Sequence, residues 1–164
     1  MISSGEHHLM YPIHTVLVTS TDGKEKNNII AVDWAMPVSF EPFLVVIAVG
    51  RCRYSHKLIS KTKQYVLCIP PYELKEAVVY CGTHHGDEVD KFKETGLTQL
   101  KAEKVKAPLI KECIACVECK VVKAVDAGDH TLFVGEVVRV VIFPENKNKT
   151  KIMNRGAMDF KEVT

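Results

Sequence analysis

Two long strand-like segments in the last third of the chain restrict the fold more than any other feature. They read "ACVECKVVKAV" (residues 115–125) and "HTLFVGEVVRVVIF" (residues 130–143), and the short stretch "DAGD" separates them. A four-residue turn that contains Gly128 is a typical connection between antiparallel neighbours. These residues therefore predict a β-hairpin and, with it, an antiparallel sheet.

Further strand segments precede this hairpin. Residues 11–20, "YPIHTVLVTS", are rich in β-branched and aromatic residues and run into the polar turn "TDGKEKNN". Residues 29–42 are apolar and interrupted by two prolines, which keep them extended. Residues 43–50, "FLVVIAVG", are continuously apolar, as is typical of a strand buried on both faces. Residues 64–70, "QYVLCIP", predict one more strand.

Three short segments predict helices. Residues 54–62, "YSHKLISKT", offer Ser55 as an N-cap, and residues 72–82 have a helical apolar pattern that ends at a glycine. Residues 86–96 read as a short charged helix that stops at Gly96. About six strands with two or three short helices favour a closed barrel or a sandwich over a doubly wound parallel sheet.

The length and composition of the chain fit one globular domain. We expect it to span residues 1–164, with a core at about residues 10–143 and a polar, loose tail at residues 144–164. A net charge of +2 is too small for a nucleic-acid surface, and no apolar run is long enough to cross a membrane. We therefore expect a cytoplasmic protein whose six cysteines are thiols.

The run "ECIACVECK" raises the question of a metal site. On a strand, Cys113 and Cys119 share one face and Cys116 points to the other, so the three sulfur atoms cannot meet at one ion. A loop between Cys113 and Cys116 is the alternative that would bring these two together. We interpret all three as small buried apolar residues and expect no metal site.

The segment "RCRYSHKLI" places basic and hydroxyl side chains where a strand passes into a helix. A helix N-terminus with free N–H groups, a hydroxyl and a guanidinium such as that of Arg53 suits a phosphate. The alternative interpretation is a capped helix with solvated basic residues.

Four motifs together resemble a known family. They are "AVDWAMPVSFEPFLVVIAV", the "RYSHKLI" junction, a glycine-containing loop before "DKF", and "GDHTLFVGEVV". In order and spacing they are similar to the flavin-reductase-like proteins with the FMN-binding split-barrel fold, including the archaeal flavoproteins of that group, over residues 10–143. The resemblance implies a six-stranded antiparallel split β-barrel with short helices. It also implies a homodimer with a flavin at each end of the subunit interface.

The resemblance further implies roles for individual residues. The flavin-binding positions that it assigns are Val32, Asp33, Trp34, Ala35, Met36, Ser39, Arg53, Tyr54, Ser55 and Lys91. Backbone groups at residues 32–36 would contact the flavin ring, and Ser39 would approach the ribityl–phosphate tail. Residues 53–55 match the phosphate junction, with Lys91 near the tail. His130 matches the histidine that related reductases place close to the flavin and the nicotinamide, and is the expected catalytic residue.

Two departures from the family pattern leave roles open. The loop that often reads "SG" in relatives is "HHG" here, which leaves His84, His85 and Gly86 without an assigned role. Asp33 stands where many relatives have a small polar residue. Its carboxylate would disfavour the reduced, negatively charged flavin unless the side chain points elsewhere.

We expect an FMN-binding oxidoreductase, with FAD a less favoured cofactor. Hydride would pass from NADH or NADPH to flavin N5, and electrons onward to free flavin, a ferric chelate, oxygen or a protein. Two alternatives remain at this point. One is an FMN-binding electron carrier without NAD(P)H turnover, and the other is a haem- or zinc-binding protein on the same barrel.

Overall fold

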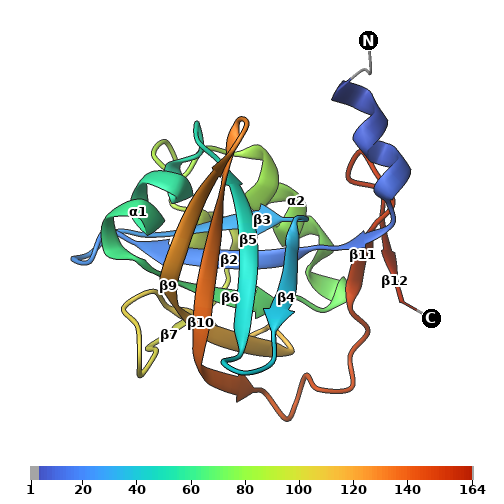
Figure 1. Cartoon of the computed structure of the whole chain (residues 1–164). Helices are drawn as coiled ribbons and strands as arrows, with labels where there is room; N and C mark the ends of the chain where they lie inside the picture. Colours follow the sequence, from blue (N-terminus) through green and yellow to red (C-terminus); the bar gives the residue numbers. More distant parts are fainter. Residues whose placement is uncertain (1–3, 164) are drawn as a thin grey trace.

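A seven-stranded antiparallel sheet forms the body of the protein, of which a computed structural model describes residues 4–163 (Figure 1). The strand order is β3-β2-β6-β9-β10-β5-β4. The strands are β2 (Val16–Thr21), β3 (Asn27–Val32), β4 (Ala35–Ser39), β5 (Leu44–Gly50), β6 (Gln64–Ile69), β9 (Ala115–Ala127) and β10 (His130–Ile142). The predicted antiparallel, mainly β architecture is confirmed, but the prediction of six strands is wrong. The extended segment 29–42 supplies parts of two strands, because the chain leaves β3 at Asp33 and starts β4 at Ala35.

The link between β3 and β4 forces the sheet to curl. These two strands stand at opposite ends of the strand order, yet only Asp33 and Trp34 separate them in the chain. Three Cα–Cα steps span at most about 11 Å, so the two edges of the sheet must lie close together. The Ala48 N–H donates to the Trp34 carbonyl at 2.9 Å and fixes this link to β5.

The predicted hairpin is confirmed as the longest pairing in the sheet. Strands β9 and β10 have 13 residues each, and His130 lies opposite Ala127. The turn is therefore two residues long, and Gly128 adopts φ +61°, the left-handed conformation that tight hairpin turns require. The register shifts twice, at Val134/Gly135 and at Val137/Arg139. Such bulges bend a strand and help a sheet to close.

Alternating side chains divide the interior into two apolar clusters. Along β2, Val16 and Val18 join the cluster that contains Ile47, Tyr65 and Phe133, whereas Leu17 joins the other. The cluster that contains Leu17 also includes Val78 and Phe92 from the helices and is called the helix-side cluster. Strand β5 is buried along most of its length, as its continuous apolar sequence predicts.

The three predicted helices lie close to their predicted positions, and a 3₁₀ segment near the N-terminus adds one that the sequence does not predict. The helical elements are the 3₁₀ segments η1 (Ser4–Met10) and η2 (Tyr72–Leu74) and the helices α1 (Tyr54–Thr62), α2 (Lys75–Thr83) and α3 (Lys91–Thr95). Helix α3 ends at Gly96 with φ +69°, as predicted, but begins at Lys91 because Asp90 caps it. The prediction that Ser55 caps α1 is wrong. The N-cap is Arg53, and Ser55 is a buried residue of the first turn. None of the described helices is long and apolar enough to cross a membrane.

The C-terminal segment is folded, so the prediction of a loose tail is wrong. Strands β11 (Ile152–Asn154) and β12 (Phe160–Glu162) join β1 (Ile13–His14) in a three-stranded sheet beside the barrel (Figure 1). Ile152 and Phe160 are buried in the helix-side cluster. These two apolar side chains anchor a segment that is polar elsewhere. The short strands β7 (Gln99–Leu100) and β8 (Leu109–Ile110) complete the fold.

The cysteines 113, 116 and 119 are fully buried, as predicted. Cys116 and Cys119 lie in different clusters, which strand alternation requires. The prediction that Cys113 shares a face with Cys119 is wrong. Strand β9 begins only at Ala115, so Cys113 lies in the preceding turn and packs in the same cluster as Cys116.

A buried carboxylate attaches the loop before β8 to the barrel. Glu118 is fully buried, and its oxygens accept the N–H groups of Glu103, Lys104 and Val105 at 2.6–3.3 Å. Arg139 donates to the same carboxylate at 3.1 Å. Burial opposes ionisation, but the N–H of Lys104 and the Arg139 guanidinium outweigh it and lower the pKa of Glu118.

We therefore predict that Glu118→Gln destabilises the protein by about 2–3 kcal/mol in urea unfolding at pH 7. The substitution removes the buried negative charge to which Arg139 and three backbone N–H groups donate. Glu103→Gln is the matched control. It removes an exposed carboxylate 2.7 Å from the same arginine and should cost about 0.5 kcal/mol.

Because folding lowers the Glu118 pKa, its stabilising effect is present above the ordinary value of 4.5 and is lost as the pH falls. The difference between wild type and Glu118→Gln should thus shrink below that pH. Equal effects of the two variants at pH 7 would contradict this assignment.

Candidate functional site

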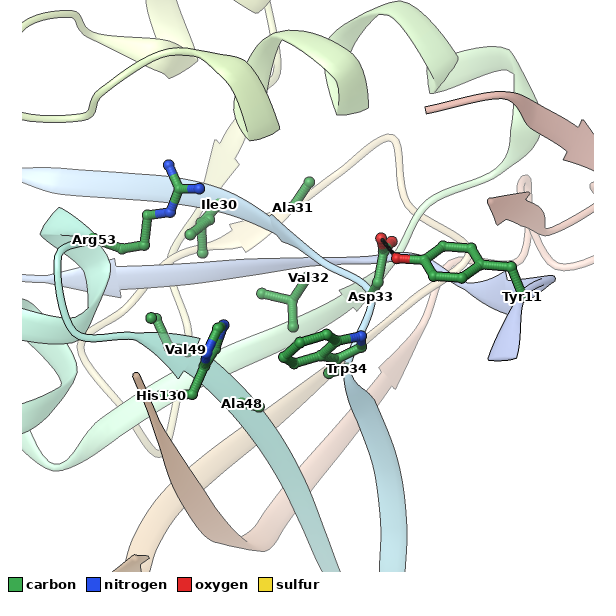
Figure 2. A pocket seen from close by; sticks show the side chains of 11 residues that line it. Tyr11, Ile30, Ala31, Val32, Asp33, Trp34, Ala48, Val49, Arg53 and His130 are labelled. Atoms are coloured by element: carbon green, nitrogen blue, oxygen red, sulfur yellow. Dashed lines mark hydrogen bonds between the residues drawn. The ribbon is translucent and has the colours of Figure 1, made fainter. Parts of the chain in front are cut away.

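A groove runs along the seam where the two edges of the sheet meet (Figure 2). It has a volume of about 190 Å³. Its lining comes from the end of β3, the end of β5 and the start of β10, and comprises Tyr11, Ile30, Ala31, Val32, Asp33, Trp34, Ala48, Val49, Gly50, Arg53 and His130. In Figure 2, Tyr11 and Arg53 mark its two ends.

The groove continues past Arg53 into a second hollow at the start of α1. The two hollows share Ile30 and Arg53. The other residues of the second hollow are Asn28, Tyr54, Ser55, Cys81, Gly82, His84, His85, Gly86 and Lys91. The two hollows are therefore neighbours, although the second has a volume of only about 10 Å³.

An indole and an imidazole face each other over the first part of the groove. The ring centroids of Trp34 and His130 are 4.8 Å apart at an interplanar angle of 44° (Figure 2). The Nδ1 atom of His130 lies 2.7 Å from the carboxylate of Asp129, and this hydrogen bond lowers the pKa of Asp129. The other nitrogen, Nε2, lies beside Gly50 on the groove wall. An imidazole held in this way can present Nε2 to a bound group.

The Asp33 side chain turns to a set of hydrogen-bond donors at the Tyr11 end of the groove. The Tyr11 hydroxyl donates to it at 3.1 Å (Figure 2), Asn154 of β11 donates at 2.9 Å, and the Thr15 hydroxyl donates to its second oxygen. Burial and the nearby carboxylate raise the pKa of Tyr11 to about 12. The charge of Asp33 is thus compensated by three donors, and its side chain fastens the C-terminal strands to the groove.

The second hollow is cationic. Lys91 is almost fully buried and donates to the Cys81 carbonyl at 2.7 Å. Burial lowers its pKa, and the nearby positive charge of Arg53 lowers it further. Helix α1 starts at Arg53 without a side-chain cap. Among the described residues, neither Arg53 nor Lys91 forms an ion pair with a carboxylate. Two cations and an uncapped helix start make this hollow suited to an anion.

The hollow depends on a close approach at Gly86. The Asn28 side chain donates to the Ser55 hydroxyl at 2.8 Å, and both residues are buried. A Cβ atom at position 86 would lie only 2.0 Å from Oδ1 of Asn28. In the loop that departs from the family pattern, glycine is therefore the residue that fits. His84 stacks on Tyr80 at a centroid distance of 3.8 Å.

The structure brings most of the predicted site residues together. Val32, Asp33, Trp34 and His130 line the groove, and Arg53 joins it to the hollow. Tyr54, Ser55 and Lys91 line the second hollow. Ala35 and Met36 lie beyond Trp34 in an apolar hollow that shares Asp33, Trp34 and Ala48 with the groove. Ser39 lies at the far end of β4, opposite Leu44, and lines neither hollow.

Sequence reasoning missed Asn28 and Ile30. Both belong to β3, but the sequence predicts a turn around Asn28 and only an extended strand around Ile30. The sequence marks Gly86 only as part of a loop that departs from the family pattern. The close approach of Asn28 explains why this position is a glycine. Among the side chains that the structure describes, no three of His, Cys, Asp or Glu are grouped so that they could hold a metal ion.

Residues 9–160 match the family model of the flavin reductase like domain. The chain belongs to this family. A protein of Archaeoglobus fulgidus is 45% identical over 131 residues, which cover 80% of this chain and 73% of the relative. The NADH-dependent FAD reductase of Streptomyces globisporus is 28% identical over 79% of this chain and 70% of its own length.

The fold is that of solved members of this group. The FMN-binding protein of Thermus thermophilus, solved with bound 1-cyclohex-2-enone, superimposes with a TM-score of 0.86 at 22% identity. The superposition covers 100% of this chain and 92% of the other. The predicted flavin-reductase-like split barrel is thereby confirmed, with the seven strands described above.

Proposed function

We propose that the protein is an FMN-binding oxidoreductase that accepts hydride from NADH or NADPH. The observation that carries the proposal is that the groove with Trp34 and His130 adjoins the cationic site at Arg53 and Lys91. A flat ring with a tail that ends in a phosphate matches this order of apolar, aromatic and cationic surfaces. Membership of the flavin reductase family supports the flavin.

The flavin ring would lie against residues 32–36. The Trp34 carbonyl already accepts the Ala48 N–H, so other backbone groups of this segment would bond the ring edge. The side chain of Asp33 is occupied by its three donors and would not face the ring as a bare charge. When bound, FMN supplies the redox chemistry by accepting a hydride at N5 and giving up electrons later.

The phosphate would lie in the second hollow. Arg53, the first N–H groups of α1 and Lys91 would bind it, and the His84–His85–Gly86 loop would enclose it. A phosphate here would also offset the cost of burying the Lys91 ammonium.

The hydride donor would stack on the open face of the flavin, with His130 at its side. Nε2 of His130 would orient the nicotinamide amide or hold a proton, and Asp129 would fix the ring. The name of the Streptomyces relative supports a nicotinamide donor. Free flavin, a ferric chelate, oxygen or a protein could be the acceptor. The cytoplasmic location remains a prediction from the sequence.

An electron carrier with the same groove but no NAD(P)H turnover is the second candidate, because nothing in the groove by itself requires a nicotinamide. A visible spectrum after addition of FMN, repeated anaerobically with NADH and then NADPH, separates the two. We expect flavin bands that bleach on addition of the donor. Bands that persist with both donors would establish the carrier. A protein that retains no flavin would refute both, and bound haem or zinc would then have to be sought.

We predict that Arg53→Ala raises the dissociation constant for FMN by about 10- to 150-fold, which corresponds to about 1.5–3 kcal/mol for a charge-assisted hydrogen bond. Fluorescence quenching of FMN measures this constant. Arg51→Ala is the matched control, because Arg51 is half-exposed, lies outside both hollows and pairs with Asp126 at 3.6 Å. Its effect should stay within about twofold, as expected for a surface ion pair. An unchanged constant in Arg53→Ala would remove this residue from the site.

We also propose a homodimer that covers the outer face of β4 and its surroundings. Several large apolar side chains are exposed there, namely Trp34, Met36, Val38, Phe40 and Phe43, with Phe40 94% exposed. Beside them lies an apolar groove of about 560 Å³ between η1 and β4. Such a contiguous apolar surface is typical of an interface.

Light scattering should give twice the chain mass of 18.4 kDa, and Phe40→Asp should shift the measured mass toward that of the monomer. A wild-type monomer would refute the dimer without affecting the flavin proposal.

A further inference from the structure

Three thiols meet on the helix side of the sheet, away from the groove. Cys68 of β6, Cys116 of β9 and Cys113 of the preceding turn are all fully buried and belong to the same apolar cluster. The sulfur atoms of Cys68 and Cys116 lie 2.9 Å apart. Cys119, which is equally buried on the same strand, lies in the other cluster.

Strand pairing places Cys68 and Cys116 directly opposite each other. The two residues are register partners in the antiparallel pair β6–β9. At the far end of the same ladder, the Val121 N–H donates to the Lys63 carbonyl at 2.9 Å. Because bonded pairs alternate along an antiparallel ladder, Cys68 and Cys116 form a non-hydrogen-bonded pair, with Cα atoms about 4.5 Å apart. That spacing lies within the range that a disulfide bond spans, about 4.4–6.8 Å.

The turn before β9 adds the third thiol. Cys113 and Cys116 have the Cys-X-X-Cys spacing, here with isoleucine and alanine between them. The Cys113 N–H donates to the Ile110 carbonyl at 3.3 Å, and the Asn146 side chain donates to the Cys113 carbonyl at 3.1 Å. Asn146 also donates to the Lys111 carbonyl, so one buried amide fixes the turn at two of its carbonyl groups.

Cys116 is the most acidic of the three thiols. Burial opposes ionisation of Cys116, but its hydrogen bonds with the Cys113 and Cys68 side chains outweigh burial and lower its pKa. The Ile110 N–H also points to this sulfur, at 3.5 Å. Burial raises the pKa of Cys68 and of Cys113 well above the ordinary value. A thiolate next to a thiol is the arrangement from which a disulfide forms.

We propose that Cys68 and Cys116 are a redox-active dithiol that a peroxide oxidises to a disulfide bond between β6 and β9. The Cys116 thiolate attacks one oxygen of hydrogen peroxide, and the O–O bond breaks to give a sulfenic acid and hydroxide. The Cys68 sulfur then attacks the Cys116 sulfur, the S–O bond breaks, and the Cys68 proton leaves with the hydroxyl as water. In sum, two thiols and one peroxide give one disulfide and two waters. Cys113 is a positioning residue that stabilises the thiolate.

Access to the dithiol requires the turn at Cys113 to open, because all three sulfur atoms are buried. Oxidation should therefore be slower than at the exposed Cys52. Loss of the two Asn146 hydrogen bonds should speed it up. In the oxidised protein, the new bond closes a loop between Cys68 and Cys116 and should raise the melting temperature by about 5–10 °C.

The test uses the full chain with Cys52→Ser, which prevents links between molecules. The protein is treated with hydrogen peroxide, its free thiols are alkylated in denaturant, and fragments are sequenced by mass spectrometry. We expect a Cys68–Cys116 link that a reductant removes. Cys119→Ser should keep it, Cys113→Ser should slow its formation, and Asn146→Ala should accelerate it.

Cys116→Ser and Cys116→Ala should both abolish the link, and the alanine variant keeps the position apolar so that folding is preserved. A link from Cys113 to Cys116 would overturn the assigned pair. Absence of any link, under conditions in which the unfolded chain becomes oxidised, would overturn the proposal. The test needs no flavin, so its outcome is independent of the proposed function.

Discussion

The two-residue connection between β3 and β4 is the constraint on which the rest of the structure depends. It ties together the two outermost strands of a seven-stranded order, so the sheet can satisfy it only by closing on itself. The groove lies on the resulting seam, between the end of β3 and the end of β5. Asp33 and Trp34 form the connection itself. They therefore belong both to the closure of the barrel and to the wall of the candidate site.

The two ends of the candidate site carry opposite charges. At one end, the Asp33 carboxylate accepts hydrogen bonds from hydroxyl and amide donors, one of which comes from the C-terminal strand β11. At the other end, Arg53 and the buried Lys91 have no ion-pair partner in the described part of the chain. Burying an ammonium without a counter-ion is costly, so this end is built for an anion that the protein itself does not provide. The proposed ring-and-phosphate ligand matches this arrangement.

The thiol centre lies in the middle of the sheet that carries the two groove walls. In the strand order, β6 and β9 separate the half that ends in β3 from the half that ends in β4. A covalent bond between Cys68 and Cys116 would join these halves, whereas the reduced pair holds them by hydrogen bonds and packing alone. The oxidation state of one cysteine pair would therefore act on the stability of the whole barrel, at a distance from the candidate site.

Local sequence was sufficient for most of the secondary structure. The hairpin around Gly128, the buried strand 44–50 and the helix that ends at Gly96 follow from residues that are adjacent in the chain. The failures share one cause. The cap of α1, the folded tail and the position of Cys113 are decided by partners distant in sequence: Asn28 for Ser55, the core for Phe160, and Asn146 for Cys113.

The class of fold follows from the residues alone, and the family follows from a resemblance spread over several motifs. The sequence also contained the residues that line the groove, because Val32, Trp34, Arg53 and His130 stand in those motifs. How those residues act together depends on the folded arrangement. In the fold, the Asp33 side chain accepts hydrogen bonds instead of facing the groove, and Asn28 packs against Gly86. Cys68 lies beside Cys116, which is 48 positions away in the sequence. Such contacts depend on strand register and barrel closure, which are properties of the whole sheet and cannot be read from any one of its segments.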